Sequence, residues 1–278
     1  MRLGVHMPQK GGFEANVKRV AAIGCRSIQI FSGNPTGWRM GKMTQEEISA
    51  RADLLEQYSI YPLVVHSAYL INLATNKEEF LLKSKKLLDE TMERAALYRS
   101  PFVILHTGNH GGEGVEKGTA QIIASIEEGL AKWPPSVKLV LENTAGSGTA
   151  IGSKIEEQAA ILQVFPAERV GFCFDTAHGF AAGYDLSSPA AVEETVQLID
   201  KIIGRDRLCV FHVNDTKVKL GSRVDRHAHI GEGNIGLEGF RALLNQGWPE
   251  DMPVILETPE NGTAWDETNM EKLASLID

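Results

Sequence analysis

Short apolar runs rich in β-branched residues recur along the whole chain. Each run is three to five residues long, as is typical of strands buried on both faces. The runs that predict strands are Leu3–His6, Ser27–Phe31, Val64–His66, Val103–His106, Leu139–Glu142, Gly171–Asp175, Cys209–His212 and Val254–Glu257.

Stretches with apolar residues at helical spacing separate these runs. Thr44 and Glu47 have the spacing of a capping box at the start of one such stretch. The stretches that predict helices are Met43–Tyr58, Lys77–Tyr98, Val115–Leu130, Ile155–Phe165, Pro189–Ile203, Leu237–Leu244 and Thr268–Ile277.

Regular alternation of strand and helix predicts a parallel sheet with right-handed crossovers. The chain has 278 residues, close to the roughly 250 residues typical of a (β/α)8 barrel. No G-x-G-x-x-G pattern follows the first run, and no linker or low-complexity tract interrupts the chain. We therefore expect an α/β protein, with residues 1–278 forming a single (β/α)8 TIM barrel domain.

Seven of the eight predicted strands end in His, Asp or Glu, whereas Ser27–Phe31 ends in Phe. Burying such a group costs several kcal/mol unless it is paired or bound to metal. In a barrel the carboxyl ends of the strands converge on one mouth, so these endings predict one shared site. Apart from His6, the candidate ligands at strand ends are His66, His106, Glu142, Asp175, His212 and Glu257.

Three further candidates extend this set. His178 follows Asp175 by three residues, and Asp225 and His227 have ligand-x-ligand spacing in a polar loop. Imidazoles and carboxylates without thiolates favour Zn²⁺, Mn²⁺ or Fe²⁺ at a catalytic site. Any one of these residues alone could be structural, but nine together would repel one another without cations and suit two or three divalent ions.

Three other histidines are expected to lie outside the metal site. His6 fits a structural or supporting role, and His110 lies in a Gly-rich segment expected to be a mobile loop. His229 could serve as a phosphate contact or a spare ligand, but a non-ligand role is favoured for it as well.

The net charge of −8 argues against a generally basic nucleic-acid-binding protein. Divalent ions among the carboxylates would nevertheless make one face locally electropositive. The three cysteines form no C-x-x-C pair, and two of them lie within apolar runs, which favours reduced, buried thiols. With neither a signal-peptide pattern nor a membrane-spanning stretch, we expect a cytoplasmic protein without membrane contact.

Several passages combine unusual residues over long matches. They are Tyr69–Ala74, Leu141–Gly146, Phe174–Asp185, and His212–Lys217 continuing through Gly221–His227 to Gly231–Gly236. Through them the chain resembles the endonuclease IV family of apurinic/apyrimidinic DNA endonucleases, and the resemblance covers essentially the whole length. It implies a (β/α)8 barrel that holds three zinc ions, with Mn²⁺ or Fe²⁺ as possible substitutes at some positions.

The resemblance also implies how the nine ligands are shared. One ion is held by His66, His106 and Glu142. Glu142 bridges to a second ion, which Asp175, His212 and Glu257 also hold, and it is the residue assigned to catalysis. The third ion is held by His178, Asp225 and His227.

The implied substrate is double-stranded DNA with an abasic site or a 3′-blocked end. The expected cut lies 5′ to the abasic site and leaves a 3′-hydroxyl and a 5′-deoxyribose phosphate, through a hydroxide nucleophile that the ions make available near pH 7. Removal of 3′-blocking groups would use the same chemistry. A monomer is expected, and no protein partner is implied.

Exposed loops supply the residues expected to contact DNA. Arg223 and Arg226 could grip phosphates, while Lys217 could do so or belong to an ordinary solvated loop. Tyr69 and Leu70 are expected to act as a wedge in the minor groove. Asn34 and Trp38 complete this set, but Thr36 and Gly37 depart from the family, which carries long polar side chains just before this Trp.

Two alternatives remain. A sugar isomerase or epimerase of the same barrel class would need a single metal, for which Glu142, Asp175, His212 and Glu257 suffice. The other five candidate ligands would then have no purpose. A catalytically silent protein that binds damaged DNA or stores metal would instead require lost ligands, and none is missing here.

Overall fold

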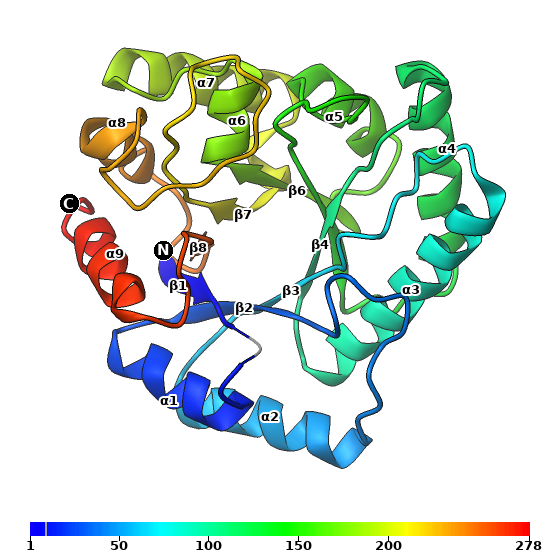
Figure 1. The fold of residues 1–278 in the computed structure, drawn as a ribbon, viewed down its shortest axis with the longest axis horizontal. Helices are drawn as coiled ribbons and strands as arrows, with labels where there is room; N and C mark the ends of the chain where they lie inside the picture. The colour runs from blue at the N-terminus through cyan, green and yellow to red at the C-terminus, as the bar shows by residue number, and fades with distance from the viewer. Residues whose placement is uncertain (9) are drawn as a thin grey trace.

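A closed parallel barrel is the centre of the fold in the computed structural model, which describes residues 1–8 and 10–278. Within these residues eight strands are hydrogen-bonded in chain order, and the last pairs with the first (Figure 1). This confirms the predicted (β/α)8 barrel. The strands are β1 Arg2–His6, β2 Ser27–Phe31, β3 Leu63–His66, β4 Phe102–His106, β5 Lys138–Glu142, β6 Val170–Asp175, β7 Leu208–His212 and β8 Pro253–Leu256.

Helices surround the strands on the outside of the barrel (Figure 1). They are α1 Phe13–Ala22, α2 Gln45–Gln57, α3 Glu78–Leu97, α4 Val115–Leu130, α5 Ile155–Leu162, α6 Thr176–Ala182, α7 Pro189–Ile202, α8 Gly236–Leu244 and α9 Ala264–Ala274, with a 3-10 turn η1 at Arg205–Arg207. Among the described residues, no helix is long and apolar enough to cross a membrane.

Local capping explains where some of these helices begin. Thr44 and Glu47 form the predicted capping box at the start of α2, with each side chain bonded to the other's backbone N–H. The prediction of the last helix was wrong at both ends. The Thr263 side chain accepts a hydrogen bond from the N–H of Trp265, so α9 starts four residues before the predicted Thr268 and ends at Ala274.

Two helices were not predicted. Helix α1 has only a short buried face, which includes Val17 and Val20. Helix α6 follows β6 without a loop because Asp175 is both the end of the strand and the N-cap of the helix, where it accepts a hydrogen bond from the N–H of His178. Nearly every residue of α6 is buried, so its sequence shows no amphipathic period.

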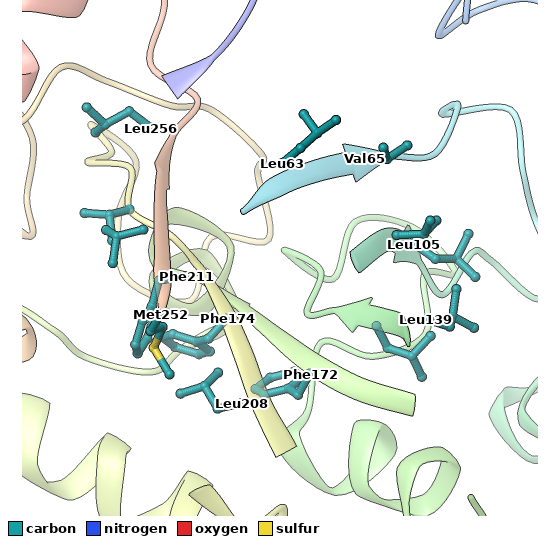
Figure 2. Close-up of a cluster of buried hydrophobic side chains, with 14 of the residues drawn as sticks. Leu63, Val65, Leu105, Leu139, Phe172, Phe174, Leu208, Phe211, Met252 and Leu256 are labelled. Carbon is teal, nitrogen blue, oxygen red and sulfur yellow. The ribbon is translucent and has the colours of Figure 1, made fainter. Parts of the chain in front are cut away.

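Successive strand residues alternate between the helix layer and the barrel interior. The interior residues include one apolar layer built from Val64, Ile104, Val140, Cys173, Val210 and Ile255. Figure 2 shows part of the larger core cluster, with labelled side chains Leu63, Val65, Leu105, Leu139, Phe172, Phe174, Leu208, Phe211, Met252 and Leu256. The inward residues nearer the strand ends are polar, and they form the site.

The contact between β1 and β2 depends on a residue without a side chain. Gly4 pairs with Ser27, and a Cβ at position 4 would overlap the Ser27 backbone carbonyl. Backbone cannot move aside as a flexible side chain can, so the strands would have to separate.

We expect Gly4→Ala to lower the free energy of unfolding by roughly 1–3 kcal/mol or more in urea denaturation. Gly41→Ala is the matched control, because a Cβ there meets nothing within 4 Å. Its effect should stay within about 0.5 kcal/mol. Equal effects of the two substitutions would show that the close approach of β1 and β2 is not a constraint.

Candidate metal centre

All nine predicted ligands come together at the mouth of the barrel. Strand pairing sets Glu142 beside His106 and Asp175 beside His212, so their side chains enter at neighbouring positions. Glu257 follows β8 directly, and its Oε2 lies 3.3 Å from Nδ1 of His212. His66 ends β3 and His178 lies in α6. The loop after β7 brings in the last two, Asp225 and His227.

Three sets of side chains could each surround an ion, because within each set one donor atom per residue lies within 4.8 Å of the others. The first ligand group is His66, His106 and Glu142. The second ligand group is Glu142, Asp175, His212 and Glu257. The third ligand group is Asp175, His178 and His227.

Asp225 borders the third ligand group. Its carboxylate lies 3.3 Å from Nε2 of His178 and 3.4 Å from Nε2 of His227. Burial acts to raise the pKa of Asp225, but hydrogen bonding and charge from the imidazoles hold that pKa at about 2. Asp225 is therefore an ionised carboxylate placed to face both rings.

The carboxylate of Glu142 is the centre of the arrangement and has no solvent exposure. Burial acts to raise its pKa, but charge from His106 and His212 and hydrogen bonds from His106 and His178 outweigh burial and hold the pKa well below its usual range. Glu257 behaves similarly, since burial is outweighed by His212 and its pKa falls to about 2. The site thus keeps negative charge in a dry environment, which requires positive charge beside it.

The tautomers of the histidines indicate that metal ions could supply this positive charge. Nδ1 of three ligand histidines donates to a backbone carbonyl: His66 to Ser67, His178 to Asn143 and His227 to Glu257. In the neutral rings Nε2 then carries a lone pair. For His66 that lone pair faces a Glu142 oxygen at 3.3 Å, which places two acceptors against each other.

A further atom lacks a partner. Nε2 of His227 is buried without a hydrogen bond to any residue in the described part of the chain. A buried imidazole nitrogen with a free lone pair, between carboxylates and other imidazoles, is the environment that a divalent cation fits. Histidine anchored through its second nitrogen is also the usual arrangement of a metal ligand.

Protons compete for the same positions. Burial acts to lower the pKa of His178, but Asp175, Asp225 and Glu142 outweigh it and raise that pKa well above its usual value. Without a cation beside it His178 would hold a proton, and metal binding at this position would release that proton.

Comparison with known proteins decides the family. A probable endonuclease 4 of Natranaerobius thermophilus is 46% identical over 278 residues, covering 100% of this chain and 98% of that protein. Another, from Halothermothrix orenii, is 42% identical and covers 94% of each chain. The crystal structure of endonuclease IV from Thermus thermophilus superposes with a TM-score of 0.86 at 32% identity, covering 99% of this chain and 98% of that one. The chain belongs to the endonuclease IV family.

More distant similarity extends beyond the endonuclease IV family. A family model described as a xylose isomerase-like TIM barrel matches residues 17–276. A D-tagatose 3-epimerase-like protein superposes with a TM-score of 0.76 at 20% identity, covering 99% of this chain and 97% of that one. That likeness shows a shared fold alone.

Two asparagines tie the candidate ligands together in this member of the endonuclease IV family. Asn143 exchanges hydrogen bonds with the backbone of Asp175 at 2.7 and 3.0 Å. Asn214 donates to Oδ2 of Asp175 at 2.7 Å and accepts from the N–H of Glu257 at the same distance. Each lies one or two residues after a ligand, at Glu142 or His212, and that adjacency was the available signal.

Gln29 is the residue that sequence reasoning missed. It lies within β2, the strand whose end is apolar, and contacts both His212 and Glu257. The available signal was a single amide inside the apolar run Ser27–Phe31. The prediction used the residues that end each strand, and Gln29 lies in the middle of one.

The three spare histidines lie outside the ligand groups found among the described residues. His6 is buried near Glu257, and burial lowers the pKa of His6 to about 4. His110 accepts hydrogen bonds from the N–H groups of Gly112 and Gly114, which fold its loop into a turn at the start of α4. His229 stacks on the ring of Trp265 with centroids 3.8 Å apart.

The predicted DNA-contact residues occupy the rim of the mouth. Tyr69 is 57% exposed and lines two hollows, one of about 260 Å³ that reaches Glu257 and one of about 490 Å³ that reaches His106. Leu70 beside it is half-buried, and Trp38 packs on the ring of Phe80. Tyr69 therefore forms a ridge across the opening.

The other residues predicted to contact DNA differ in how their side chains are held. The side-chain oxygen of Asn34 accepts from the N–H and hydroxyl of Thr36, so Asn34 shapes its own loop. The side chains of Lys217, Arg223 and Arg226 are exposed on the loop after β7. The Arg223 backbone is held in a left-handed conformation, with φ 59°.

Asp215 anchors the loop that carries Asp225 and His227. Its carboxylate accepts hydrogen bonds of 2.8 to 3.1 Å from four backbone N–H groups, those of Thr216, Gly231, Gly233 and Ile235. Bonds to a charged acceptor each contribute about 1.5–3 kcal/mol. The positions of Asp225 and His227 thus depend on a residue that belongs to none of the three ligand groups.

We expect Asp215→Ala to lower the free energy of unfolding by about 3 kcal/mol or more, because it leaves four backbone donors unpaired, two of them on the buried residues Thr216 and Ile235. Metal bound at the third ligand group should be lost as well, as measured by elemental analysis. Asp185→Ala is the control, since Asp185 caps only the exposed turn at Ser187. A fully metallated Asp215→Ala protein would show that the loop holds its shape without this carboxylate.

Proposed function

We propose that this protein is a metal-dependent DNA-repair endonuclease that hydrolyses the phosphodiester 5′ to an abasic site. The products would be a 3′-hydroxyl and a 5′-deoxyribose phosphate, and 3′-blocking groups would be removed by the same chemistry. The observation that carries the proposal is the set of three ligand groups that share Glu142 and Asp175 at one barrel mouth. Membership of the endonuclease IV family supports it.

The proposed ligands match the first and second ligand groups, while in the third Asp225, which faces His178 and His227, takes the place of Asp175. His66, His106 and Glu142 would hold one ion. Glu142 would also contact a second ion, held with Asp175, His212 and Glu257. His178, Asp225 and His227 would hold a third. Zinc suits this nitrogen and oxygen donor set, and Mn²⁺ or Fe²⁺ could replace it at some positions.

When bound, the ions would supply a hydroxide nucleophile near neutral pH and neutralise charge on the phosphate and the leaving oxygen. The protein's own residues fix where this happens. Glu142, the proposed catalytic residue, joins the first and second ligand groups through a carboxylate that solvent does not reach. A thiolate route has no support, because burial raises the pKa of Cys173, the cysteine nearest the centre, to about 12.

Duplex recognition is assigned to the rim. Arg223, Arg226 and Lys217 would contact phosphates, which sets position on DNA without reading sequence. Tyr69 and Leu70 would act as a wedge that helps to extrude the abasic nucleotide, and a missing base lowers the cost of unstacking. Asn34 and Trp38 would approach the duplex from the loop after β2, where Thr36 and Gly37 are too short to fill the base stack.

The proposal extends to the whole chain. Residues 1–278 would act as one catalytic domain in a monomer that needs no membrane and works on DNA in the cytoplasm. The alternative, a sugar epimerase or isomerase with one metal, finds support only in the shared fold. It leaves the other five candidate ligands, His66, His106, His178, Asp225 and His227, without a purpose.

We expect the metal-loaded protein to cut an end-labelled duplex that carries one tetrahydrofuran analogue immediately 5′ to the analogue. The analogue cannot undergo β-elimination, so any product must come from hydrolysis. Metal analysis of the same sample should find about three ions per chain, and prolonged chelation should abolish cutting until zinc returns. A fully loaded protein that leaves the duplex intact would refute the proposal and redirect tests to sugars.

Tyr69→Ala should weaken binding to abasic duplex at least about tenfold, because the ridge no longer offsets the cost of unstacking. Hydrolysis of a small phosphodiester, bis(p-nitrophenyl) phosphate, should change less than about twofold. Tyr61→Ala is the matched control, since Tyr61 is 54% exposed and precedes the opposite end of β3. Equal losses on duplex and small substrate would place Tyr69 in the metal centre instead.

A further inference from the structure

Strand β2 contributes a buried amide to the metal centre instead of a ligand. Gln29 has no solvent exposure, and its side chain contacts His212 and Glu257 inside the barrel. Both partners belong to the second ligand group, with Glu142 and Asp175. One amide thus contacts two candidate ligands of the same ion.

The partners fix the orientation of this amide. The Nε2 atom of Gln29 lies 2.5 Å from Oε1 of Glu257 and 2.9 Å from Nδ1 of His6. An ionised carboxylate can only accept, so the amide nitrogen, with its two hydrogens, must face Glu257 and His6. The amide oxygen is then the atom that faces His212, at 2.8 Å from Nε2.

This orientation determines the protonation of His212. An amide oxygen can only accept, so Nε2 of His212 must carry hydrogen. In the neutral ring Nδ1 then bears the lone pair, and it faces Oε1 of Glu142 at 3.1 Å and Oε2 of Glu257 at 3.3 Å. The ligand atom of His212 is therefore Nδ1, whereas His66, His178 and His227 are anchored through Nδ1 to backbone carbonyls.

The same amide also selects an oxygen of Glu257. Its hydrogen bond occupies Oε1, while Oε2 is the oxygen that approaches His212. Glu257 is thus anchored at its carboxylate by Gln29 and at its backbone by Asn214, which accepts a hydrogen bond from the Glu257 N–H. Without these contacts the side chains of His212 and Glu257 could rotate, and fixing them when a cation binds would cost conformational entropy.

We propose that Gln29 is the positioning residue of the second ligand group, fixing the His212 tautomer and directing one Glu257 oxygen toward the ion. This inference rests on the proposed metal function. Gln29 has no hydrogen bond to a side chain found only in the first or third ligand group, among the residues that the structure describes. Its loss should therefore affect one ion of the three.

The first test measures metal retention in the full-length, zinc-loaded protein. Gln29→Leu should release about one zinc ion to a chelator at least about tenfold faster than the unsubstituted protein does, with the other ions unchanged. Gln121→Leu is the matched control: Gln121 donates to the backbone carbonyls of Leu73 and Thr75 and touches no ligand. Circular dichroism checks that both variants are folded.

The second test reads the tautomer directly by nitrogen NMR of ¹⁵N-histidine-labelled, zinc-loaded protein. Gln29→Leu removes the acceptor that faces His212, so it should lose the hydrogen-bonded Nε2–H signal, whereas the control variant Gln121→Leu should keep it. A merely structural glutamine would not give this split between the two variants.

The outcomes separate two failures. If the unsubstituted protein binds no zinc, the proposed metal function itself is wrong. If it binds zinc but Gln29→Leu keeps the ordinary release rate and the ordinary His212 signal, only the role of Gln29 is overturned. The same acceleration in Gln121→Leu would also overturn it, because the effect would then be a general loss of packing.

Discussion

The mouth of the barrel depends on one buried carboxylate. Four imidazoles, those of His66, His106, His178 and His212, approach the oxygens of Glu142 to between 3.0 and 3.3 Å. A carboxylate without solvent costs several kcal/mol unless positive charge lies beside it. The chain must therefore keep cations at this point, either as protons on histidine or as metal. The strands of the barrel and their loops are arranged so that either protons or a metal ion can occupy the same place.

Backbone carbonyls and side-chain amides orient the candidate ligands. Backbone carbonyls hold Nδ1 of three histidines, Asn214 links Asp175 to Glu257, and Gln29 contacts His212. These partners lie on strands or directly after them, and a closed barrel of paired strands is rigid. Rigid support keeps the donor atoms near the positions that they would occupy around a cation. Binding a cation then costs less conformational entropy.

Loops complete the candidate metal centre that the barrel strands begin. The fold is shared with an epimerase-like protein at only 20% identity, and a shared barrel does not by itself specify a reaction. Asp225 and His227 enter from the long loop after β7, which Asp215 anchors through four backbone N–H groups. Tyr69 forms the ridge on the rim. Two candidate ligands and this ridge therefore lie on segments that the ring of strands holds in place.

The sequence by itself determined the barrel and the set of candidate ligands, because both leave local marks. Apolar runs alternate with amphipathic stretches, and ligands such as His106 and Glu142 end those runs. Helix α6 left no such mark, since a helix buried all round shows no period. Only the tertiary structure decided which candidate ligands lie close enough to share an ion, that backbone carbonyls hold Nδ1 of His66, His178 and His227, and that Gln29 contacts the site. These properties arise from contacts between strands distant in sequence, which no local pattern records.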